Sequence, residues 1–146
     1  MRLDPSAVRP LDDLADVLAA RGRFHRAADV YEARLRIDER SFDTVYKLAL
    51  ARYSSGDAHG VLTVISRSEA LDDTSSRLHY LEGLCLRETG RLDDAAAALA
   101  RALELEPGLA PAREALADTY RRLGRPEDEI EQLQLLAGLD PAADRA

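Results

Sequence analysis

Several kinds of residue and segment are scarce in this chain, and each scarcity excludes a class of protein. Cys85 is the only cysteine, so no intrachain disulfide can form, and a reducing compartment is the simplest inference. No stretch of 18 apolar residues occurs, and residues 1–5 lack the apolar run of a signal peptide. We therefore expect a cytoplasmic protein without membrane insertion.

Positive charge is also in deficit, because 20 basic residues stand against 27 acidic ones and the formal net charge is −7. Recognition of nucleic acid usually needs a basic face, so we expect no nucleic-acid partner. Lys47 is the only lysine among the basic residues, and such a bias toward arginine is typical of a GC-rich bacterial genome.

What the chain does have is a repeat of 34 residues. Gly22, Gly56, Gly90 and Gly124 follow one another at this spacing. Fifteen residues after each glycine comes an aliphatic residue followed by an acid, and seven residues before each comes alanine or glycine. A period of this length is the sequence signature of stacked repeats, in which each unit buries its apolar face against its neighbours.

Within each unit the apolar residues recur at helical spacing. The glycines stand where a first helix would end in the left-handed conformation, which glycine adopts without a Cβ penalty. Asp57 is expected to cap the second helix of its unit, Pro126 suits a first helical turn, and Pro107 and Pro141 are expected to end second helices. The pattern predicts eight antiparallel helices, at about residues 8–21, 24–38, 42–54, 58–70, 75–89, 92–105, 110–123 and 126–138.

The unit resembles the tetratricopeptide repeat. The third unit carries the pattern most fully, with Gly83, Leu86, Gly90, Leu92, Ala95, Leu99, Ala102 and Pro107. Two departures stand out, since Arg34 occupies a usual alanine position and Arg52 replaces a tyrosine. The resemblance implies an all-α fold, a right-handed α-solenoid of antiparallel helix hairpins over residues 1–146. Its four repeats would lie at about 8–41, 42–75, 76–109 and 110–143, and residues 1–7 resemble the tail of a preceding repeat.

The same resemblance implies that the first helices line a concave groove for a peptide or helix of another protein. Tyrosine and arginine, which often carry the binding energy of interfaces, are frequent among the predicted groove residues. These residues are Tyr46, Leu50, Tyr53, Arg77, Tyr80, Leu84, Arg87, Arg121 and Arg122. The alternative is that the tyrosines lie half-buried between units and that the arginines are solvated surface. One subgroup of the family grips a carboxylate with a basic residue and an asparagine, but here Asp12 and Asp16 occupy those places, so we expect no such clamp.

Patterns that carry catalysis are missing. The glycines are too far apart for a phosphate-binding loop, and no cluster with metal-ligand spacing accompanies His25 and His59. Cys85 falls in a helix interior with no adjacent histidine to activate it. We expect no enzyme, no cofactor and no metal.

The sequence thus favours a non-catalytic scaffold or adaptor that binds a partner protein in its groove. Two alternatives remain, a small secretion-type chaperone for one client and the regulatory or substrate-presenting arm of a larger enzyme. The last predicted helix would leave Ile130, Leu133 and Leu136 partly uncovered, which suggests either a segment of a longer array or a C-terminal face that a partner or a second copy covers.

Overall fold

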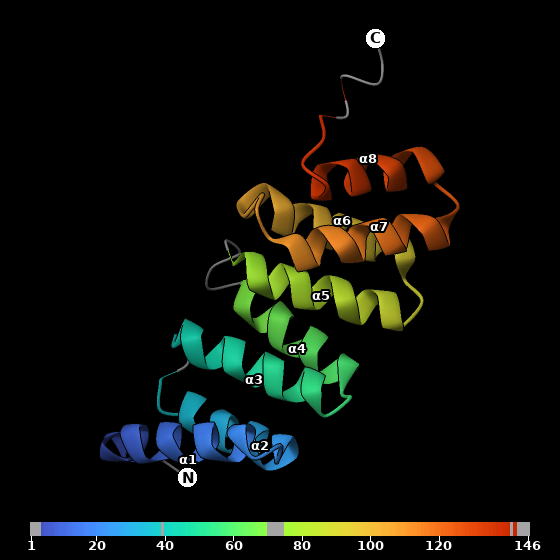
Figure 1. Cartoon of the computed structure of the whole chain (residues 1–146). Coiled ribbons are helices and arrows are strands. Elements are labelled where there is room, and N and C mark those ends of the chain that lie inside the picture. Colours follow the sequence, from blue (N-terminus) through green and yellow to red (C-terminus); the bar gives the residue numbers. More distant parts are fainter. Residues whose placement is uncertain (1–3, 39, 70–74, 141, 143–146) are drawn as a thin grey trace. The chain divides into compact units, whose positions relative to one another are not determined.

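The computed structural model describes residues 4–38, 40–69, 75–140 and 142. In these ranges the secondary structure is helical, with a short 3-10 helix at Pro5–Ala7 before the first α-helix (Figure 1). The eight α-helices are α1 (Val8–Ala20), α2 (Phe24–Leu35), α3 (Phe42–Ser54), α4 (Ala58–Glu69), α5 (Ser76–Glu88), α6 (Leu92–Leu105), α7 (Ala110–Leu123) and α8 (Pro126–Leu136). The predicted helices are confirmed in number and order. Pro141 and residues 1–3 of the expected repeat tail lie outside the described ranges.

Contacts divide the chain into two compact units, Met1–Asp73 and Thr74–Ala146. In the first unit α1 packs on α2, α2 on α3 and α3 on α4. In the second unit α5 packs on α6, α6 on α7 and α7 on α8, and α5 also touches α7. Each unit therefore holds two hairpins, and its two first helices (α1 and α3, or α5 and α7) are available to line one surface.

The glycine positions explain why every hairpin turns at the same place. Gly22, Gly56, Gly90 and Gly124 all have positive φ, between 71° and 83°, which a residue with a Cβ rarely adopts. The next residue donates its N–H to a carbonyl near the end of the first helix, as Arg91 does to Leu86 at 2.8 Å. Asp57 then accepts from the N–H of Gly60 at 2.9 Å, which confirms its predicted cap.

Small residues allow the two helices of a hairpin to approach closely. Ala95 and Ala102 of α6 are fully buried, and a Cβ built on Gly83 of α5 would lie 2.5 Å from Cγ of Leu99. The close α5–α6 packing that Ala95 and Ala102 predict is therefore confirmed, and Gly83 provides the matching gap on the opposite helix.

Replacing Ala95 by leucine should lower the free energy of unfolding by about 1–3 kcal/mol, because added methylenes in a packed core force neighbours to move. Chemical denaturation measures this loss. Ala97→Leu is the matched control, since Ala97 lies on the same helix but is exposed, and its change should stay within about 0.5 kcal/mol. Equal stability of the two variants would contradict this packing.

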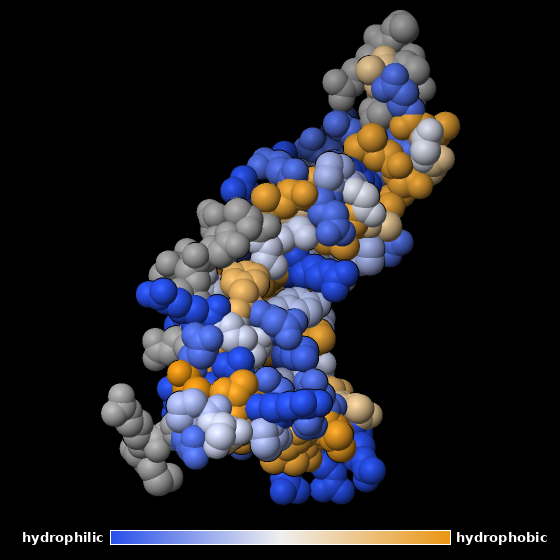
Figure 2. All heavy atoms as spheres, turned by 90° about the vertical axis from the view of Figure 1, so that its left-hand side faces the viewer, coloured by the Kyte–Doolittle hydropathy of each residue, from blue (hydrophilic) through white to orange (hydrophobic). Residues whose placement is uncertain are grey.

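Large apolar side chains remain exposed on the first and the last helix. Leu14 and Val17 of α1 are exposed, as are Ile130 and Leu133 of α8. Figure 2 shows apolar surface toward the top of its view, around the last helix. The predicted exposure of Ile130 and Leu133 is confirmed, and Leu136 is half-buried. The exposure of Leu14 is not evident from the sequence, where it belongs to the apolar pattern of the helix.

Candidate partner-binding surfaces

The first unit has an apolar hollow of about 250 Å³ between α1, α2 and α3. Leu50 is its most exposed large apolar residue, and the ring of Phe24 forms part of the wall. The described lining residues are Ala19, Phe24, Tyr31, Lys47, Leu50, Ala51 and Ser54. We call this the first hollow. Its apolar lining suits an aliphatic or aromatic side chain.

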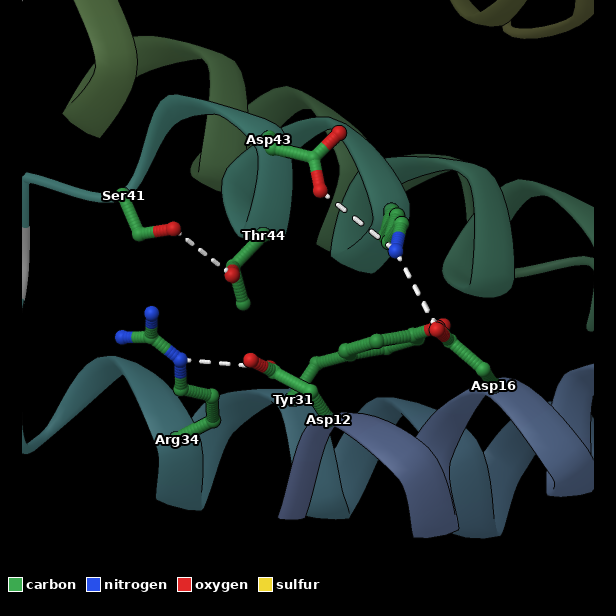
Figure 3. Close-up of polar contacts among 8 residues, drawn as sticks. Asp12, Asp16, Tyr31, Arg34, Ser41, Asp43 and Thr44 are labelled. Atoms are coloured by element: carbon green, nitrogen blue, oxygen red, sulfur yellow. Dashed lines mark hydrogen bonds and ion pairs between the residues drawn. The ribbon is translucent and has the colours of Figure 1, made fainter. Parts of the chain in front are cut away.

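A polar cluster fixes the wall of the first hollow (Figure 3). The hydroxyl of Tyr31 donates to Oδ1 of Asp16 at 2.7 Å, and Nζ of Lys47 donates to the same carboxylate at 3.3 Å. Lys47 also pairs with Asp43 at 3.4 Å. Burial and the bond to Asp16 raise the pKa of the Tyr31 hydroxyl, so it stays protonated as a donor. Partial burial lowers the pKa of Lys47, but Asp16 and Asp43 outweigh this effect and the net shift is upward.

A second contact in Figure 3 joins α1 to α2. Nε of Arg34 donates to Oδ1 of Asp12 at 3.1 Å, and Arg34 is almost fully buried. Nη1 of Arg34 is buried and has no hydrogen-bond partner among the described residues. The Asp12 carboxylate thus binds the buried Arg34 guanidinium and is not available to a binding partner.

Arg52, the other departure from the repeat pattern, joins three helices. Its Nη2 donates to Oε1 of Glu32 on α2 at 2.6 Å, and its Nη1 donates to the carbonyl of Gly60 on α4 at 3.1 Å. Arg67 of α4 pairs with the same carboxylate of Glu32 at 3.2 Å. The arginine therefore replaces the packing of an aromatic ring by charge-assisted hydrogen bonds.

The second unit has a more polar hollow of about 230 Å³ between α5 and α7. The described lining residues are Tyr80, Leu84, Arg87, Pro111, Glu114 and Ala115. Leu84 is buried, so it forms the floor, while Tyr80 and Arg87 are half-buried at the sides. We call this the second hollow.

Beside the second hollow three arginines meet one carboxylate, that of Asp118 on α7. Arg87 Nη1 lies 3.0 Å and Arg122 Nε 3.1 Å from Oδ2, and Arg121 pairs with Oδ1. The side chains of Arg121 and Arg122 are half or more exposed. We call these four residues the Asp118 cluster. The cluster carries three positive charges against one negative charge, and Glu114 adds a second negative charge in the hollow beside it.

The structure places the predicted groove residues unevenly. Tyr80, Leu84 and Arg87 meet at the second hollow, and Arg121 and Arg122 join Arg87 through Asp118. Leu50 lines the first hollow; Tyr46 and Tyr53 are half-buried on α3 and are not among its described lining residues. Arg77 is exposed on the first turn of α5. Sequence reasoning misses Phe24 and Lys47, although Lys47 could have been noticed as the only lysine of the chain.

Candidate chemistry elsewhere is sparse. His25 and His59 are exposed, and Cys85 is fully buried. Over the described ranges, no three histidine, cysteine, aspartate or glutamate side chains gather where they could hold a metal ion. In the same ranges no helix combines the length and hydrophobicity needed to cross a membrane.

These features define an all-α protein of helical hairpins whose first helices carry the accessible hollows. Models of the tetratricopeptide repeat match residues 11–43 and 76–109. The chain belongs to the tetratricopeptide repeat proteins. No curated protein sequence matches it.

Solved structures agree with this fold. MamA from Desulfovibrio magneticus RS-1 is similar with a TM-score of 0.83 and 21% identity, over 94% of this chain and 77% of that one. YrrB is described as a tetratricopeptide repeat protein with an unusual peptide-binding site. It is similar with a TM-score of 0.79 and 25% identity, over 94% of this chain and 71% of YrrB. A third similar structure is the Yersinia enterocolitica type III secretion chaperone SycD in complex with a peptide of the translocator YopD. Its TM-score is 0.75 and its identity 19%, over 82% of this chain and 97% of SycD.

Proposed function

We propose that this chain is a non-catalytic, cytoplasmic scaffold that binds a peptide or helix of another protein on the first helices of its repeats. The observation that carries the proposal is that each unit has a hollow to which both of its first helices contribute, with the exposed Leu50 in one and the half-buried Tyr80 in the other beside ionic groups. The YrrB and SycD structures support it, because both similar proteins are described with peptide binding.

The two hollows suit different parts of a bound peptide or helix. The first hollow offers Leu50 and Phe24, and its charged neighbours already neutralise one another, so it suits an apolar side chain. The second hollow has Tyr80 and Arg87 at its sides and the Asp118 cluster beside it, so it suits an acidic group next to an aromatic or aliphatic one. We therefore expect a guest segment that is apolar in one part and acidic in another.

The test is binding of the double variant Leu50→Ala/Tyr80→Ala, which truncates one lining residue of each hollow, after affinity capture from native lysate has identified a partner. A titration with the purified partner should show at least about a tenfold loss of affinity, which corresponds to about 1.4 kcal/mol. The midpoint of thermal unfolding should fall much less than the affinity. Leu139→Ala is the control, since Leu139 is exposed and lines neither hollow.

Two results would change the conclusion. A parallel loss of stability and affinity would mean that Leu50 and Tyr80 act as packing residues. Co-purification with one unstable client, encoded beside this chain, would indicate a dedicated chaperone instead of a general scaffold.

A further inference from the structure

The last helix exposes side chains whose counterparts in earlier repeats are buried. Leu133 of α8 is 48% exposed, whereas its counterparts three, two and one repeats earlier, Tyr31, Ile65 and Leu99, are 3%, 3% and 0% exposed. Within each unit the next first helix covers the equivalent face, since α3 packs on α2 and α7 packs on α6. The face of α8 that carries Leu133 and Ile130 is thus built to receive a first helix.

The first helix, α1, exposes the apolar face that in later repeats packs on the preceding second helix. Leu14 of α1 is 49% exposed, whereas its counterparts Leu48 and Leu116 are 0% and 2% exposed. Val17 is likewise exposed, and its counterpart Thr119 is fully buried. The α1 face is therefore built to pack on the second helix of a preceding repeat.

We propose that copies of this chain associate head to tail, with α8 of one copy packing on α1 of the next as α2 packs on α3 and α6 on α7. The occupant is a second copy because the chain itself carries the complementary apolar face, at the repeat positions that meet within each unit. Burial of Leu14, Val17, Ile130 and Leu133 supplies the driving force.

The charged residues near the two faces also fit the proposed contact between copies. In the second unit Arg87 of α5 pairs with Asp118 of α7, 31 residues later. A shift by one repeat places Arg121 opposite the position that Asp16 takes in an adjoining copy. Arg121 is two-thirds exposed and the Asp16 side chain is nearly half exposed, so both groups are accessible for this contact. The basic side of α7 would then face the acidic side of α1.

Because the two faces differ, the contact is heterologous and leaves one free face at each end of every open assembly. Association then continues until a ring closes or the concentration becomes limiting. Binding in the hollows does not require this contact, so partner binding and head-to-tail association can be tested independently.

The test is sedimentation velocity with two blocking variants, Leu14→Glu and Leu133→Glu. Wild type should show a mass that rises with concentration through dimer and larger species. Each variant alone should remain a monomer, because one of its two faces is blocked. An equimolar mixture should form a dimer and nothing larger, because each variant keeps the face that the other lacks.

Leu50→Glu is the matched control, since it adds the same charge in the first hollow and should leave association unchanged. Circular dichroism checks that every variant folds, and Leu14→Ser with Leu133→Ser replaces any variant that does not. A wild-type monomer at the highest soluble concentration would overturn the proposal, and these faces would then belong to another partner. Unimpaired association of Leu14→Glu would overturn it too, in favour of a symmetric α8–α8 contact, as would a mixture that stays monomeric.

Discussion

Replacing Leu99 by alanine is expected to lower the free energy of unfolding by about 2–5 kcal/mol. Leu99 is fully buried in the α5–α6 hairpin, where its side chain fills the space beside Gly83 and Ala95. These small neighbours have no rotatable side chain that could move into the gap, so a cavity remains and the upper part of the range applies. Denaturant titration of the purified protein measures the loss.

The chain contains its own control for this prediction. Leu133 is the same residue type at the same place of the next repeat, but it is half exposed. Leu133→Ala should therefore cost less than about 1 kcal/mol when measured on the monomer. If the two variants lost equal stability, the face of α8 would be covered in solution and the assigned exposure of Leu133 would be wrong.

The buried pair of Arg34 and Asp12 leads to a second large effect. Asp12→Ala should lower the free energy of unfolding by about 1–3 kcal/mol, because it leaves the guanidinium buried without its carboxylate. We place the value below the usual 3–5 kcal/mol for a broken buried pair, since the Asp12 side chain is 35% exposed and water can reach the site. Unfolding by urea, followed by circular dichroism, measures it.

Replacement of the other partner of the pair, Arg34, should have a different effect on stability. Arg34→Leu removes the buried charge together with the unsatisfied Nη1 atom, so we expect stability to be unchanged or raised. Asp13→Ala is the control for the loss of one negative charge from α1, because Asp13 is exposed, and its effect should stay within about 0.5 kcal/mol. A loss for Arg34→Leu as large as that for Asp12→Ala would show that the pair itself stabilises the fold.

Most of the fold could be predicted from the sequence because the local signals recur. A glycine at a fixed place in each unit sets the end of a helix, and the same backbone conformation follows at Gly22, Gly56, Gly90 and Gly124. Helical spacing of apolar residues then gives the remaining boundaries. The exposure of the last helix was also predicted, but that of the first helix was not, because Leu14 carries the repeat signature but lacks the neighbouring helix that buries its counterpart Leu48.

The candidate site was harder to predict, because its contacts join helices that are distant in the sequence. Register alone suffices to place Tyr80, Leu84 and Arg87 beside one another. It does not reveal that Asp118 would gather Arg87 with two further arginines, or that Arg52 would bridge to Glu32. These pairings depend on side-chain reach across the packed helices, which a one-dimensional pattern does not contain.

The order of helix contacts also bears on how the chain acquires its structure. Within each unit almost every contact joins helices adjacent along the chain, with α5 and α7 as an exception. Such low contact order is typical of polypeptides that fold in microseconds to milliseconds. Since each hairpin is stabilised mainly by its immediate neighbours, backbone amides of the outermost hairpins should exchange with solvent sooner than those next to them.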